Sequence, residues 1–97
     1  MFKAIDVWKR LSEGELARYR CFQILPENRY CVQSVDFYRQ PLDEVRMRAL
    51  DSQFVELLLG DAPNAANETY GTLEEAIAKH DLDFRDFEED LANDAGR

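Results

Sequence analysis

The 97-residue chain has one histidine, two cysteines and four glycines, and each scarcity argues against a class of chemistry. His80 is the only imidazole and no C-x-x-C pair is present, so the sequence lacks a usual zinc ligand set. The glycines stand too far apart to form a phosphate-binding loop. No G-x-S-x-G or similar motif marks a nucleophile. We therefore expect a protein that is not an enzyme and that uses no metal and no cofactor.

Long apolar runs are also missing. No segment approaches the roughly 18 apolar residues of a membrane helix. The first ten residues, MFKAIDVWKR, contain no apolar stretch of signal-peptide length, because Asp6 interrupts them. These features predict a cytoplasmic protein without a membrane partner.

The composition is that of one small globular domain with an uneven distribution of charge. Apolar residues make up 45% of the chain and charged residues 33%. The net charge is −8, but residues 1–40 hold seven Lys/Arg against five Asp/Glu, whereas residues 61–97 hold three against eleven. The basic front and acidic back suggest an acidic segment that lies near the chain's own strands or serves a partner.

Residues 3–12 fit two kinds of element. Ala4, Ile5, Trp8 and Leu11 fall at helical spacing, and Gly14 suits the end of a helix. A short strand through Ile5 and Val7 is the alternative. A short helix is the favoured interpretation.

Residues 16–25 and 30–38 predict a β-hairpin around the turn-forming sequence LPENR. An isolated hairpin is marginally stable, so it must pack on helices, gain a third strand or pair edge to edge with a second copy of the chain. The third strand would come from residues 2–8 or 68–70. If neither supplies it, a homodimer through the hairpin edge is the natural solution.

The hairpin register decides whether the two cysteines form a disulfide. Pairing Leu25 with Tyr30 places Cys21 and Cys31 on opposite faces of the sheet, too far apart to bridge. In this register Cys31 shares a face with four apolar residues, namely Phe22, Ile24, Val35 and Phe37. We expect two free thiols, with Cys31 in the core.

Two helices are predicted after the hairpin. Residues 42–59 hold a stripe of core residues: Met47, Leu50, Phe54, Leu57 and Leu58. Residues 72–80 begin with the capping-box pair Thr72 and Glu75, and residues 61–68 read as a loop. The predicted fold is a single α+β domain over residues 1–87, in the order helix, β-hairpin, helix, helix, with a two- or three-stranded antiparallel sheet. Residues 88–97 are expected to form an acidic, mobile tail.

The candidate binding residues are of the types enriched at protein interfaces or able to attract a charged partner. Those on the hairpin are Arg18, Arg20, Arg29, Tyr30, Tyr38 and Arg39, and those near the C-terminus are Phe87, Glu88, Glu89 and Asp90. They predict a non-catalytic protein-interaction module, either an adaptor or an acidic inhibitor of a basic protein. The alternatives are a nucleic-acid-associated regulator that uses the basic hairpin, which the charge of −8 disfavours, and an enzyme on an unrecognised scaffold.

Overall fold

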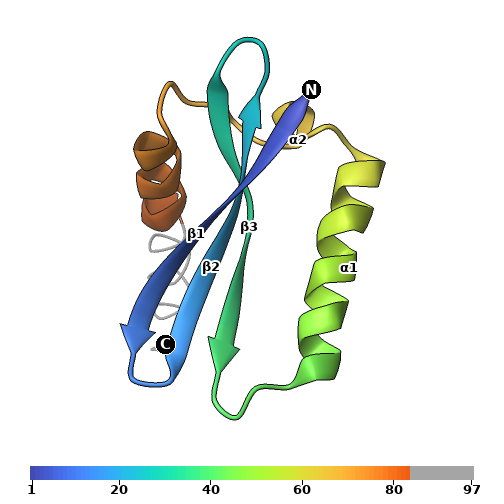
Figure 1. Cartoon of the computed structure of the whole chain (residues 1–97). Coiled ribbons are helices and arrows are strands. Elements are labelled where there is room, and N and C mark those ends of the chain that lie inside the picture. Colours follow the sequence, from blue (N-terminus) through green and yellow to red (C-terminus); the bar gives the residue numbers. More distant parts are fainter. Residues whose placement is uncertain (84–97) are drawn as a thin grey trace, which may run out of the picture.

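A computed structural model describes residues 1–83 of the chain. The elements are β1 (Phe2–Ser12), β2 (Glu15–Ile24), β3 (Arg29–Arg39), α1 (Glu44–Gly60), α2 (Pro63–Ala66) and a further helix over residues 73–83. The strands form one antiparallel sheet in the order β1-β2-β3 (Figure 1). The predicted α+β class is confirmed, and the predicted tail at residues 88–97 lies outside the described part of the chain.

The first element is a strand, so the favoured helix over residues 3–12 is wrong. β1 pairs with β2 along its length, with Ile5 opposite Cys21 and Val7 opposite Tyr19. Ile5 and Val7 are half-buried between exposed neighbours, which is the two-residue period of a strand. Gly14, with φ of 79°, supplies the turn between β1 and β2 rather than the end of a helix. Long-range pairing thus outweighs the helical spacing, and residues 2–12 provide the third strand.

The hairpin register differs from the expected one in two places. Near the turn Gln23, rather than Leu25, lies opposite Tyr30, because the connection takes up residues 25–28. Farther along, Val32 lies opposite Cys21 and Ser34 opposite Arg20. Gln33 therefore has no partner on β2 and forms a β-bulge.

The bulge changes which face the second half of β3 presents. Because side chains alternate, one extra residue moves every later side chain to the other face. Val35 packs beside Tyr19, and Phe37 lies opposite Ala17, whereas the expected register placed both with Cys31. That part of the prediction is wrong, but the placement of Cys21 and Cys31 on opposite faces is confirmed by their separate core clusters.

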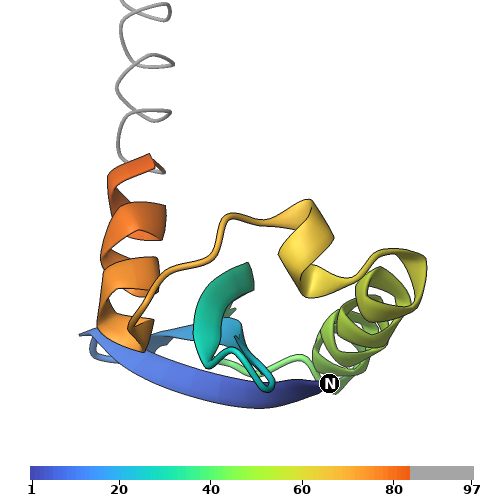
Figure 2. The same cartoon turned by 90° about the horizontal axis from the view of Figure 1, so that it is seen from above.

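Each face of the sheet packs against one helix. On one face Cys21 and Tyr19 pack with Ala76 of the 73–83 helix, and on the other Phe22 packs with Phe54 of α1. The two helices stand on either side of the strands (Figure 1). Seen from above, the chain passes from α1 through α2 to the 73–83 helix along one side of the hairpin (Figure 2).

The 73–83 helix is confirmed with its predicted cap. The Glu75 backbone N–H donates to the Thr72 hydroxyl oxygen over 3.1 Å. Tyr70, just before this helix, forms an isolated antiparallel bridge with Tyr30 at the free side of β3. Residues 61–68 are not all loop, because Pro63 begins the short helix α2.

α1 begins after Asp43, whose side chain accepts hydrogen bonds from the backbone N–H groups of Val45 and Arg46. It is confirmed as a helix, but it contains no buried residue. Four residues of the expected core stripe are half-buried, namely Met47, Leu50, Phe54 and Leu58. Leu57 is 40% exposed, so its predicted place in the core is wrong. No helix in residues 1–83 is long and apolar enough to cross a membrane.

The two thiols should be inert in the native chain. Both cysteines are fully buried, and burial raises the pKa of Cys21 to about 12. Burial also raises the pKa of Cys31. Since the thiolate is the reactive form, we expect neither to react with Ellman's reagent at pH 8 within minutes, and both to react in denaturant. Rapid modification of the native chain, or an oxidised chain containing a Cys21–Cys31 disulfide, would contradict this placement.

Candidate functional site

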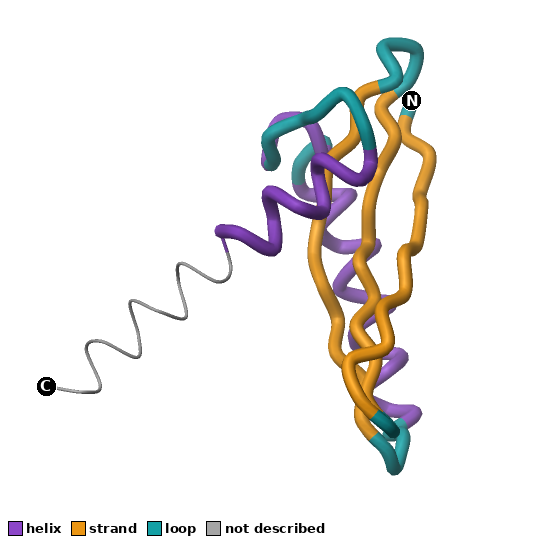
Figure 3. Tube along the Cα trace, turned by 90° about the vertical axis from the view of Figure 1, so that its left-hand side faces the viewer, coloured by secondary structure: helices purple, strands orange, loops and turns teal. Residues whose placement is uncertain are grey.

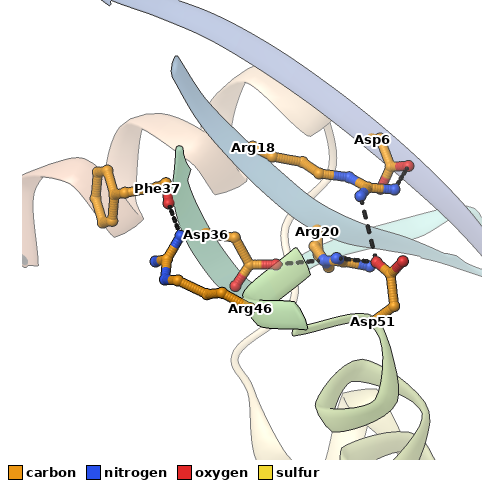
Figure 4. Close-up of polar contacts among 7 residues, drawn as sticks. All are labelled: Asp6, Arg18, Arg20, Asp36, Phe37, Arg46 and Asp51. Atoms are coloured by element: carbon orange, nitrogen blue, oxygen red, sulfur yellow. Dashed lines mark hydrogen bonds and ion pairs between the residues drawn. The ribbon is translucent and has the colours of Figure 1, made fainter. Parts of the chain in front are cut away.

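α1 is held to the sheet by a network of two arginines and three aspartates. The Arg20 side chain, on β2, is 4% exposed and bonds to Asp36 and Asp51 (Figure 4). Its Nε lies 2.6 Å from Asp36 Oδ2, and its Nη2 lies 2.6 Å from Asp51 Oδ1. Asp36 belongs to β3 and Asp51 to α1, so one guanidinium joins two strands and a helix.

Arg18 extends the network to β1. Its Nη2 lies 2.7 Å from Asp6 Oδ2, and its Nη1 lies 3.6 Å from the same Asp51 oxygen that Arg20 contacts (Figure 4). The Arg18 guanidinium also lies 5.0 Å from the ring centroid of Trp8. Asp6, Arg18, Asp51, Arg20 and Asp36 are called the arginine–aspartate network below.

The network stabilises the charged forms of Arg20, Asp51 and Arg18. Burial opposes the charged form of Arg20, but the bonds to Asp51 and Asp36 outweigh it and raise the pKa of the guanidinium. The bond from Arg20 lowers the pKa of Asp51, although the Asp51 side chain is 64% exposed. The bond to Asp6 raises the pKa of Arg18. All three groups are ionised at neutral pH, and they form ion pairs within the network.

Next to the network, where β1–β3 run toward the start of α1, the surface is hollowed into a groove of about 580 Å³. Apolar side chains that remain partly exposed line it: Leu11 is 45%, Leu16 38% and Leu42 59% exposed. The apolar lining also includes Phe37, Tyr38, Pro41 and Met47. We call this hollow the strand-end groove.

The rim of the strand-end groove carries both signs of charge. Arg39 pairs with Glu15 across the strands, over 3.1 Å, and its side chain is 79% exposed. Arg46 reaches from α1 to the sheet, where its Nη1 donates to the Phe37 carbonyl over 2.6 Å (Figure 4). Asp43 lies on the same rim. A second hollow of about 240 Å³ shares Leu16, Tyr38 and Leu42 with the groove, so the apolar lining continues past its edge.

The structure separates the arginines that were predicted as one binding patch. Arg18 and Arg20 belong to the arginine–aspartate network, whereas Arg29 bonds to Thr69 near the hairpin tip. Arg39 lies on the rim of the strand-end groove, at the opposite end of β3. The four arginines of the hairpin therefore lie at three separate locations and do not form one basic patch. Each of them is bonded to a neighbouring residue.

The predicted aromatic residues are also separated. Tyr30 exchanges two backbone hydrogen bonds with Tyr70, both over 2.8 Å, and this role is structural. Tyr38, 5% exposed, lies in the groove wall with its ring 5.6 Å from that of Trp8. Phe87, Glu88, Glu89 and Asp90 lie outside the described residues.

Sequence reasoning missed the apolar lining of the groove. Leu11, Leu16 and Leu42 flank turns, where periodicity assigns no face, and Leu42 precedes the stripe of α1. The clue in the sequence is that these positions at the ends of elements hold leucine rather than the polar residues usual near turns.

His80, the only imidazole, packs edge-on against Tyr19, with ring centroids 6.2 Å apart. The Tyr19 hydroxyl donates to Asp81 over 2.7 Å, and burial together with this bond raises the pKa of Tyr19 to about 12. Within residues 1–83 no group of three His, Cys, Asp or Glu side chains is placed to hold a metal ion.

Comparisons with protein-family models, with curated proteins and with solved structures give no match for this chain.

Replacing Arg20 should be among the most damaging substitutions in the sheet. Arg20→Met leaves Asp36, whose side chain is 10% exposed, without its guanidinium partner. Breaking a buried pair in this way costs about 3–5 kcal/mol in the free energy of unfolding. Arg39→Met, at an exposed ion pair, should cost less than about 1 kcal/mol. Urea denaturation measures both, and equal losses would contradict the assigned role of Arg20.

Replacing the Arg20–Asp36 ion pair with an apolar pair offers a second check on the same contact. Arg20→Met combined with Asp36→Leu removes both charges, and should recover a large part of the stability that Arg20→Met loses.

Because Asp51 belongs to the network, the free energy of unfolding should depend on pH. Its folded pKa is lowered, so its stabilising contribution is complete at neutral pH and is lost as the pH falls from about 5 through the folded pKa. We expect Asp51→Asn to lower the free energy of unfolding by about 1 kcal/mol at pH 7, a figure reduced for solvent exposure. Below the folded pKa, where Asp51 is protonated, the stabilities of the two proteins should converge. Glu56→Gln, at an exposed site of α1, is the control, and a pH-independent difference for Asp51→Asn would count against the assignment.

Proposed function

We propose that this chain is a non-catalytic, cytoplasmic protein-interaction module that binds its partner in the strand-end groove. The observation that supports this proposal is the set of leucines in the groove, which stay 38% to 59% exposed although all three line the same hollow. Clusters of exposed apolar side chains rimmed by polar groups mark interaction sites more often than isolated ones do.

The groove has a wall that does not need the partner in order to form. Tyr38 is almost fully buried, and Arg46 fixes the first turn of α1 to β3 through the Phe37 carbonyl. Because Arg20 and Asp51 hold the middle of the same helix, the two sides of the groove are set before a partner arrives. Such preorganisation lowers the entropic cost of binding.

The chemistry of the lining indicates what the partner presents. Leu11, Leu16 and Leu42 accept apolar side chains, and a volume of about 580 Å³ admits a few of them rather than a folded domain. Arg39 and Glu15 on the rim can exchange their mutual bond for bonds to a partner. We infer that the partner inserts apolar side chains from an exposed helix or loop, with polar groups around them. In this proposal the chain acts as an adaptor or an inhibitor by covering that segment.

Nucleic acid is a weaker candidate for this surface. Arg18 and Arg20 are engaged by three aspartates, and Arg39 is engaged by Glu15. A phosphate backbone would have to compete with each of these pairs, and the net charge of −8 would repel it.

The test is an affinity capture from native cell extract with matched leucine variants. Leu42→Asp places a charge in the groove, and Leu59→Asp places the same charge at the end of α1, where Leu59 is 81% exposed. Because burying one leucine at an interface contributes about 1.5–3 kcal/mol, we expect Leu42→Asp to weaken capture at least tenfold and Leu59→Asp to leave it unchanged.

Quantitative mass spectrometry of the retained proteins, with circular dichroism to show that both variants fold, gives the readout. A partner retained equally by both variants, or lost equally from both, would place binding elsewhere. Retained nucleic acid that is released by salt would favour the alternative instead.

A further inference from the structure

The two edges of the sheet are treated differently by the rest of the chain. At the β3 edge Tyr30 exchanges two backbone bonds with Tyr70, and Arg46 bonds to the Phe37 carbonyl. At the β1 edge the sheet simply ends: β1 is the border strand of the three, and the described residues place no strand beside it (Figure 3).

The backbone groups that β1 turns outward follow from its pairing with β2. Met1 and Leu25 exchange backbone hydrogen bonds, of 2.8 Å and 3.4 Å. In an antiparallel ladder such pairs recur at every second residue, so Lys3, Ile5 and Val7 bond to β2 as well. The residues between them turn their N–H and C=O groups away from β2: Phe2, Ala4, Asp6 and Trp8.

Two aromatic side chains lie along this open edge on the α1 face. Phe2 is 39% and Trp8 is 52% exposed, although each already has an aromatic neighbour, Phe22 and Tyr38 respectively. An exposed strand with apolar side chains and unpaired backbone is a template for pairing with another strand.

A second copy of the chain can pair with this edge in only a few registers. A two-fold axis perpendicular to the sheet makes the two β1 strands antiparallel and places the same face of each copy on the same side. Residues opposite each other then share a face, so their numbers must be both even or both odd. The choice among these registers depends on which side chains meet.

One register brings favourable pairs of side chains opposite each other across the two β1 strands. With the axis at Ile5, Phe2 lies opposite the second copy's Trp8, and Ala4 lies opposite its Asp6. Aromatic cross-strand pairs are stabilising, and no like charges lie directly opposite in this arrangement. A shift that places the axis at Asp6 would oppose Asp6 to its own copy and Lys3 to Lys9.

We propose that the chain forms a two-fold homodimer through β1, with Ile5 at the axis, which makes one continuous six-stranded sheet. None of residues 2–8 lines the strand-end groove, although Trp8 packs against Tyr38 of its wall, so this inference goes beyond the proposed function. It also differs from a dimer through the hairpin, because β1 already occupies one edge of β2 and Tyr70 pairs with the other strand of the hairpin.

Sedimentation of the full chain at increasing concentration is the first measurement, and we expect the mass to double. Two variants at one exposed position test the register. Ala4→Lys places a cation opposite the second copy's Asp6, and should tighten the dimer about three- to tenfold, whereas Ala4→Asp should weaken it by a similar factor. Leu59→Lys and Leu59→Asp make comparable changes in charge at the end of α1 and should have no effect.

Amide hydrogen exchange tests the same edge without any substitution. The N–H groups of Ala4, Asp6 and Trp8 should become protected as the concentration rises, whereas those of Lys3, Ile5 and Val7 should be protected at every concentration.

Four outcomes would overturn the proposal. The first is a chain that remains monomeric at several hundred micromolar, and the second is a dimer in which Ala4, Asp6 and Trp8 exchange freely. The third is a dimer whose affinity changes equally with Ala4→Lys and with Ala4→Asp. This result is expected if the two-fold axis lies at Trp8, because Ala4 then lies opposite Ser12. A monomer whose β1 amides become protected only on binding a different protein would also exclude self-pairing.

Discussion

The buried guanidinium of Arg20 is the interaction on which the rest of the structure depends. α1 contains no fully buried residue, and its apolar contact with the sheet is made by half-buried side chains such as Phe54 and Leu58. Arg20 must be neutralised because it is buried, and the carboxylates within reach come from β3 and α1. The pairing of one buried charge thus adds a polar tie between α1 and the sheet to the packing of Phe54, and that helix in turn forms one side of the strand-end groove.

Local sequence patterns predicted the α+β class of this chain but not the pairing and register of its strands. The stripe in α1, the cap of Thr72 and the turn at LPENR are local patterns, and the elements that they predicted are present. The strand over residues 2–12 depends on Cys21 and Tyr19, which lie far along the chain, so local spacing misled. The bulge at Gln33 has no local signature at all, and it reversed the faces of Val35 and Phe37.

The candidate site shows the same division. Arginines and tyrosines were sound choices as residue types, but the sequence could not show that aspartates from three other elements would occupy Arg18 and Arg20. Tyr38 and Arg39 do reach the groove. Its leucines were missed because their exposure is a property of the assembled surface, where the strand ends meet the start of α1.

Because one cysteine lies on each face of the sheet, the two thiols can report separately on the opening of the helical layers that cover these faces. Cys21 lies beneath the 73–83 helix, and Cys31 lies in the layer that α1 covers, where its thiol points to the Pro63 carbonyl. A thiol becomes accessible only when its layer opens. Slow labelling of each thiol thus separates the opening free energy of one helical layer from that of the other, in a chain that carries no added label.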